Sequence, residues 1–76
     1  QGTLLLIENI DRPGMIAAYS TTLGKNKVNI ADMSLARNKD TGLALTLLTL
    51  DSAPSAEVIQ ELEAIDGIKR IRSLTV

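Results

Sequence analysis

The stretch from Glu8 to Ile16, with the letters ENIDRPGMI, contains the residue types of this chain that are best suited to hold a small ligand. It joins an apolar run to an amphipathic one through a polar turn that includes Pro13 and Gly14. Backbone N–H groups are free in the first turn of a helix, and the helix dipole favours negative charge there. The loop can therefore hold a carboxylate or another anion, although the same residues also suit a plain turn with a helix cap.

Asn29 is the second candidate, eighteen residues after Asp11 and at the start of the next apolar run. We expect the first two strands to be neighbours in the sheet, which brings Asn29 to the turn between Asp11 and Gly14. Together these residues would hold a zwitterion, with its carboxylate on the helix N–H groups and its ammonium on Asp11 or an asparagine carbonyl. The structural alternative for Asn29 is a loop cap.

The composition excludes most other kinds of site. The 76 residues carry a net charge of −1 and include no Cys, no His and a single aromatic residue, Tyr19. The usual zinc ligands, thiol nucleophiles and imidazole bases are therefore missing. A near-neutral charge and the lack of stacking aromatics argue against nucleic-acid and membrane partners. We expect a non-catalytic, cytoplasmic domain without a metal; an acylphosphatase-like enzyme using Arg12 and Asn29 is a third-choice alternative.

The apolar periodicity predicts the order β-α-β-β-α-β. Six segments are expected: a strand at 3–8 buried on both faces, a helix at 13–25, hairpin strands at 28–37 and 43–50, a helix across 58–65, and a strand at 68–76. Two right-handed crossovers then give a ferredoxin-like α+β fold, a four-stranded antiparallel sheet with both helices on one face. Leucines on both faces of strand 43–50 suggest that the open face or a sheet edge meets another subunit or domain.

Local details of these elements are also predicted. Asp11 or Arg12 is expected to cap the first helix, and Gly67 is expected to end the second in a left-handed conformation. The buried stripe of the first helix should contain Met15, Ile16, Tyr19 and Leu23. In the second strand, alternation puts Val28, Ile30 and Asp32 on one face.

The loop residues 9–16, together with Leu23-Gly24 and the run VNIADMSLAR from Val28 to Arg37, resemble an ACT domain, a small regulatory amino-acid-binding module. The resemblance covers essentially the whole chain. It is similar to the subgroup that ends D-3-phosphoglycerate dehydrogenases, and nearly as similar to the one in iron–sulfur L-serine dehydratases. It implies that residues 1–76 are a single regulatory domain from the C-terminal part of a longer enzyme. That enzyme would bind NAD, whereas this domain would bind no cofactor.

The resemblance also implies how the effector is bound. Two domains would pair edge to edge into an eight-stranded sheet, as a homo-oligomer with L-serine between them. The implied ligand-binding residues are Asn9, Asp11, Arg12, Pro13, Gly14, Met15, Ile16, Asn29 and Ile30. This chain has Asn9 where the dehydrogenase pattern has His, Asp11 where it has Asn, and Lys27 where a helix-ending Gly is usual. Glycine or another small amino acid is the next choice of ligand, and a dimerisation module without a ligand is the alternative function.

Overall fold

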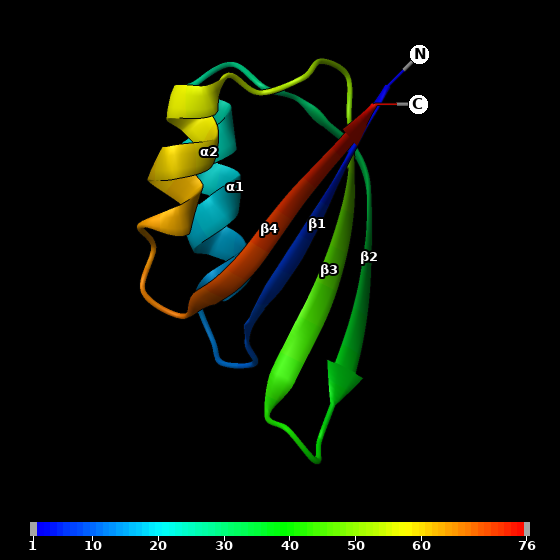
Figure 1. The fold of residues 1–76 in the computed structure, drawn as a ribbon, viewed down its shortest axis with the longest axis vertical. Helices are drawn as coiled ribbons and strands as arrows, with labels where there is room; N and C mark the ends of the chain where they lie inside the picture. The colour runs from blue at the N-terminus through cyan, green and yellow to red at the C-terminus, as the bar shows by residue number, and fades with distance from the viewer. Residues whose placement is uncertain (1, 76) are drawn as a thin grey trace.

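The computed structural model describes residues 2–75 and has the predicted β-α-β-β-α-β order. The elements are β1 (Thr3–Ile10), α1 (Met15–Lys25), β2 (Ile30–Asn38), β3 (Leu43–Leu50), α2 (Ala56–Glu63) and β4 (Ile68–Thr75). Figure 1 shows two layers, with both helices on one side of the sheet. The ferredoxin-like α+β fold is thus confirmed. No helix within residues 2–75 is long and apolar enough to cross a membrane.

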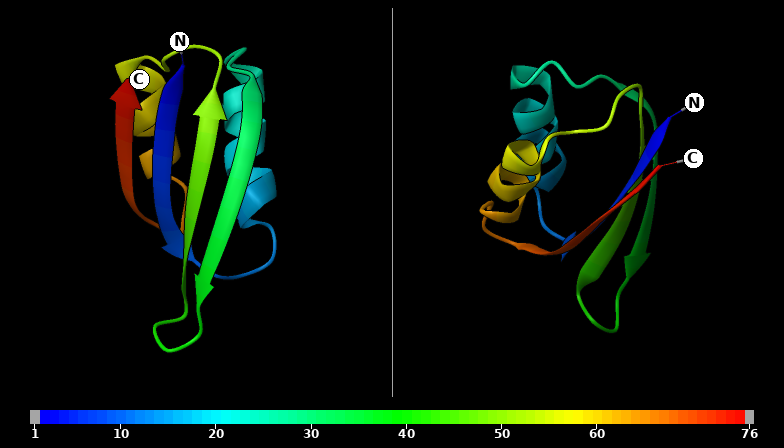
Figure 2. Two further views of the ribbon diagram at one scale, coloured as in Figure 1. Left: turned by 90° about the vertical axis from the view of Figure 1, so that its right-hand side faces the viewer. Right: turned by 45° about the horizontal axis from the view of Figure 1, so that its top comes forward.

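The strands of the sheet lie in the order β2-β3-β1-β4, and all three pairings are antiparallel. The left view of Figure 2 looks onto the open face, where β1 and β3 occupy the centre. The expectation that the first two strands are neighbours is therefore wrong. The leucine-rich strands β1 and β3 take the buried central positions, while the more polar β2 and β4 form the edges.

A bulge at the start of β2 overturns a second expectation. Ile30 pairs with Leu50, but Asp32 pairs with Thr49, so one extra residue stands in β2. Because side chains alternate along a strand, this residue turns Ile30 toward the helices and leaves Asp32 on the open face. The prediction that Ile30 and Asp32 share a face is therefore wrong.

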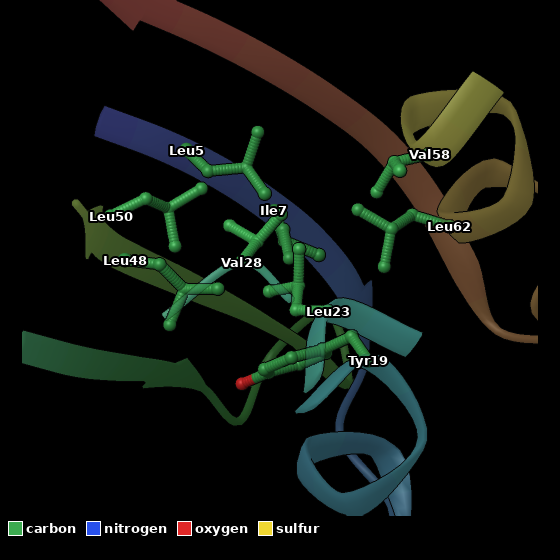
Figure 3. Packing of buried hydrophobic residues seen from close by; sticks show 9 residues of the cluster. All are labelled: Leu5, Ile7, Tyr19, Leu23, Val28, Leu48, Leu50, Val58 and Leu62. Atoms are coloured by element: carbon green, nitrogen blue, oxygen red, sulfur yellow. The ribbon is translucent and has the colours of Figure 1, made fainter. Parts of the chain in front are cut away.

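The core lies between the sheet and the helices. Strand β1 alternates between buried and half-buried residues, so only one of its faces is fully buried, not both as expected. Tyr19 is completely buried, and its hydroxyl lies 3.3 Å from Oγ1 of Thr46, which satisfies the polar end of the ring. The cluster drawn in Figure 3 consists of Leu5, Ile7, Tyr19, Leu23, Val28, Leu48, Leu50, Val58 and Leu62.

Helix α1 begins at Met15 instead of Pro13, and its N-cap is Gly14, in a left-handed conformation with φ 89° and no side-chain cap. Neither Asp11 nor Arg12 caps the helix, because both side chains are engaged in ion pairs elsewhere. The predicted stripe is confirmed at Met15, Tyr19 and Leu23, which are buried. Ile16 departs from it and is 37% exposed.

Helix α2 is capped by Ser55, whose Oγ accepts a hydrogen bond from the backbone N–H of Val58. The helix ends at Glu63 with Ala64 as its C-cap. Gly67 is left-handed as predicted, with φ 100°, but it stands in the turn that leads into β4. Val76, the last residue of the predicted final strand, lies outside the described residues.

Candidate functional site

The loop between β1 and α1 forms one wall of a surface hollow of about 260 Å³. The hollow is lined by Asp11, Arg12, Pro13, Gly14, Ile16 and Arg37. Five of these six residues are among the nine predicted to bind a ligand. Since one water molecule takes a share of roughly 30 Å³ in the liquid, the space can admit a small organic molecule.

Asp11 and Arg37 place opposite charges in this hollow, with Nε of Arg37 3.1 Å from Oδ1 of Asp11. The Arg37 side chain is 61% exposed and that of Asp11 34% exposed. An ion pair this exposed typically adds only about 0–1 kcal/mol to stability. A ligand that carries both charges can therefore separate the pair at little cost. The backbone N–H of Asp11 donates to the carbonyl of Gly42 at 3.0 Å, which anchors the loop to the β2–β3 hairpin.

Arg12 points across to the turn before β4. Its Nη2 donates to the backbone carbonyl of Asp66 at 2.8 Å and to Oδ2 of Asp66 at 3.0 Å. A Cβ atom at Gly67 would come within 3.0 Å of both Nη2 of Arg12 and Sδ of Met15, so only glycine fits there without a shift. Arg12 thereby ties the β1–α1 loop to the α2–β4 turn.

Asn9 lies on the helix-covered face of β1, just before the loop. It is 3% exposed, and its Nδ2 donates to the carbonyl of Ile10 at 2.9 Å. Its Oδ1 is buried and accepts no hydrogen bond from the described residues. An unsatisfied buried acceptor typically costs about 1–3 kcal/mol, so this atom is poised to accept a donor. Neither Asn9 nor the buried Met15 lines the hollow itself.

Asn29 and Ile30 lie at the opposite end of the sheet from the loop. The backbone carbonyl of Asn29 accepts from the N–H of Asp51, beyond the end of β3, whereas Asp11 bonds to Gly42 before its start. The intervening strand of eight residues spans about 25 Å. Within one chain Asn29 therefore cannot reach a ligand beside Asp11, and the expected convergence of these residues is wrong.

The cause of this separation is the strand order. Both β1 and β2 are antiparallel to β3, so they run in the same direction and their first residues lie at the same end of the sheet. The loop follows the end of β1, while Asn29 precedes the start of β2. The same separation excludes an acylphosphatase-like site within one chain, since Arg12 and Asn29 lie at opposite ends of the sheet.

Arg37 is the residue of the hollow that the sequence did not indicate. Arg37 ends the run VNIADMSLAR, but nothing in that run predicts a contact with Asp11, which lies 26 residues earlier in the sequence. The contact forms because β1 and β2 run in the same direction on either side of β3, so that Arg37 and Asn9 both pair with Ala44 and the end of β2 lies level with the β1–α1 loop. Within residues 2–75, no group of three or more His, Cys, Asp or Glu side chains is placed to hold a metal ion.

Residues 3–67 match the family model of the ACT domain, which confirms the resemblance seen in the loop and in the second strand. The chain belongs to the ACT domain family. This ACT domain is 39% identical over 71 residues to D-3-phosphoglycerate dehydrogenase of Methanocaldococcus jannaschii. The match covers 93% of the chain and 14% of that relative. It is 37% identical over 70 residues to the D-3-phosphoglycerate dehydrogenase of Archaeoglobus fulgidus, and this match covers 90% of the chain and 13% of that relative.

Solved structures share the fold of this ACT domain at low sequence identity. The ACT domain from GTP pyrophosphokinase of Chlorobium tepidum superposes with a TM-score of 0.75 at 17% identity, over 96% of each chain. A formyltetrahydrofolate deformylase from Pseudomonas putida gives a TM-score of 0.81 at 10% identity, over the whole of this chain and 29% of the deformylase chain. The fold thus occurs in proteins of quite different names, and the ligand has to be argued from the site.

Proposed function

We propose that this ACT domain senses a small amino acid, L-serine as first choice, and so regulates a D-3-phosphoglycerate dehydrogenase of which it forms the C-terminal domain. In this proposal the domain itself catalyses nothing, the parent enzyme binds NAD elsewhere, and the protein is cytoplasmic. The relatives named D-3-phosphoglycerate dehydrogenase support the choice of parent enzyme. Serine fits as an effector because the attached enzyme would take part in serine metabolism.

The observation that carries the proposal is the pair of opposite charges in the hollow. Asp11 and Arg37 are 3.1 Å apart, beside the first turn of a helix that has no side-chain cap. An amino-acid zwitterion matches this arrangement, with its ammonium on Asp11 and its carboxylate on Arg37 and the free N–H groups of α1. The unpaired Oδ1 of Asn9 offers a further acceptor just below the loop.

A second copy of the domain would bring Asn29 into the same site. Strand β2 is an edge strand whose residues are mostly exposed, and such an edge can pair with another strand. If two β2 strands pair antiparallel about Ser34, Ala31 of the partner subunit lies opposite Arg37. Asn29 of the partner subunit then lies two residues further on, beside the hollow. In such an eight-stranded sheet, Asn29 and Asp11 would meet across the two copies although they are separated within one chain.

Regulation follows if the effector binds one relative orientation of the two domains more tightly. A ligand held by residues of both copies stabilises the arrangement in which those residues meet. Allosteric coupling energies are typically about 1–3 kcal/mol, which suffices for feedback control of the attached enzyme.

The first test is calorimetric titration of L-serine into the wild-type chain and into Asp11→Ala and Asn29→Ala. Loss of a hydrogen bond to a charged ligand group costs about 1.5–3 kcal/mol, so each variant should bind roughly ten- to a hundredfold more weakly. Glu63→Ala is the control, because it removes an exposed carboxylate on α2 that lies outside the hollow.

Mixing the two variants tests whether the site is shared. In a mixed pair, Asp11 from one copy and Asn29 from the other rebuild one intact site, so random pairing restores about a quarter of the sites. If both residues acted within one chain, mixing would restore none. Wild-type affinity in both single variants would refute the assignment of the site to Asp11 and Asn29. A wild-type chain that binds no serine would leave the dimerisation module without a ligand as the better description.

The second candidate for the parent enzyme is an iron–sulfur L-serine dehydratase, favoured by the same loop and strand residues. The complete open reading frame separates the two candidates. A dinucleotide-binding glycine fingerprint upstream identifies a dehydrogenase, whereas a cluster of cysteines identifies the dehydratase.

A further inference from the structure

Asn29 is joined to Asp51 by two hydrogen bonds at the end of the sheet where β2 begins and β3 ends. Nδ2 of Asn29 donates to Oδ2 of Asp51 at 2.6 Å. The backbone N–H of Asp51 donates in turn to the carbonyl oxygen of Asn29 at 3.1 Å. Both residues are exposed, so the side-chain bond is not needed to satisfy a buried group.

The chemistry of the two side chains sets the orientation of the Asn29 amide. An ionised carboxylate only accepts hydrogen bonds, so the amide has to turn its NH₂ group toward Asp51. Bonds of this kind, with one charged partner, are shorter and stronger than neutral ones. The amide oxygen Oδ1 then faces away from Asp51, and no group among residues 2–75 donates to it. The Oδ1 atom of Asn29 is thus available to accept a hydrogen bond from a bound ligand.

We propose that Asp51 is a positioning residue that fixes Asn29 as an acceptor for the ammonium group of the bound amino acid. This inference rests on the proposed function, in which Asn29 of the partner subunit completes the hollow beside Asp11 and Arg37. With the amide reversed, Asn29 would direct an N–H group at the ammonium and repel it.

A purely structural role for Asp51 predicts something different. The backbone bond from Asp51 to Asn29 does not depend on the side chain of residue 51, so it holds the two strands together in any variant at this position. Asp51→Asn preserves the shape of the side chain and removes only its charge and its acceptor-only character. The variant amide can then meet Asn29 in either orientation, and the orientation of Asn29 is no longer fixed.

A double-mutant cycle on the chain tests the proposal, with L-serine affinity measured by calorimetry for wild type, Asp51→Asn, Asn29→Ala and the double variant. Asp51→Asn should weaken serine binding about tenfold, and the double variant should bind no more weakly than Asn29→Ala, because Asp51 acts through Asn29. Glu63→Gln, the same loss of charge at an exposed carboxylate on α2, should bind like wild type. Glycine, which keeps the ammonium but lacks the hydroxyl, should lose affinity by the same factor.

The other outcomes overturn the inference in distinguishable ways. Wild-type affinity in Asp51→Asn, or losses that add up in the double variant, would refute the positioning role while leaving the proposed function intact. If Asp51→Asn weakened the binding of serine but not of glycine, the amide oxygen of Asn29 would accept from the ligand hydroxyl, and its assignment to the ammonium group would be refuted. A wild-type chain that binds neither serine nor glycine would refute the proposed function together with this inference.

Discussion

Replacing Gly14 by valine should abolish effector binding while the domain stays folded. Gly14 has φ 89°, and a Cβ atom added there meets no other atom within 4 Å. The cost in stability is therefore one of backbone conformation, about 1–2 kcal/mol for a side chain forced into the left-handed region. For a domain of this size that lowers the melting temperature by roughly 5–15 °C. The added carbons project from a residue that lines the hollow, where they exclude a ligand.

Gly42→Val is the matched control. Gly42 also has a positive φ, 73°, with nothing within 4 Å of an added Cβ, but it does not line the hollow. Its bond to Asp11 uses the backbone carbonyl, which valine retains. Both variants should lose similar stability in thermal melts followed by circular dichroism. In 10 mM L-serine the melting temperature of Gly42→Val should rise as it does for wild type, whereas that of Gly14→Val should not, since a ligand stabilises only a state that it binds. A serine-induced rise in Gly14→Val equal to that of the control would refute the assignment of this loop.

Further predictions concern assembly, backbone strain and acid stability. At micromolar concentration the chain should sediment as a dimer or a larger species, and a clean monomer would contradict the edge-paired site. Gly67→Ala should destabilise the domain by about 1–3 kcal/mol in urea titrations, because it combines a positive φ with contacts of 3.0 Å to Arg12 and Met15. Gly24→Ala, in the exposed part of α1 where an added Cβ meets nothing within 4 Å, should instead stabilise by about 0.5–1 kcal/mol. Hydrogen bonds from Lys25, and then from Asn26, lower the pKa of Glu61 below its ordinary value. The resulting stabilisation is present above the ordinary pKa of a glutamate and is lost as the pH falls through the depressed pKa. Thermal melts between pH 7 and pH 3 should therefore show a smaller loss of stability for Glu61→Gln than for wild type; equal losses would contradict this role of Glu61.

The sequence by itself was enough to predict the elements and the fold class. Strand Leu43–Leu50 has the bounds that its alternation predicted, and Met15, Tyr19 and Leu23 form the buried stripe of α1. These features depend on residues close together in the chain, and their periods of two and 3.6 residues are visible in a single sequence. The loop from Asp11 to Gly14 could be found for the same reason, since a polar turn with Pro and Gly between two apolar patterns is a local signal.

The tertiary structure decided which of these residues can act together. One extra residue in β2 reversed the face of Ile30, and the strand order placed Asn29 at the far end of the sheet from Asp11. The same order brought Arg37 to Asp11 across 26 residues of sequence, a contact that no local pattern predicts. Strand order and register depend on which hydrophobic surfaces can be buried together by the whole chain, so they arise from contacts between distant residues that no local pattern encodes.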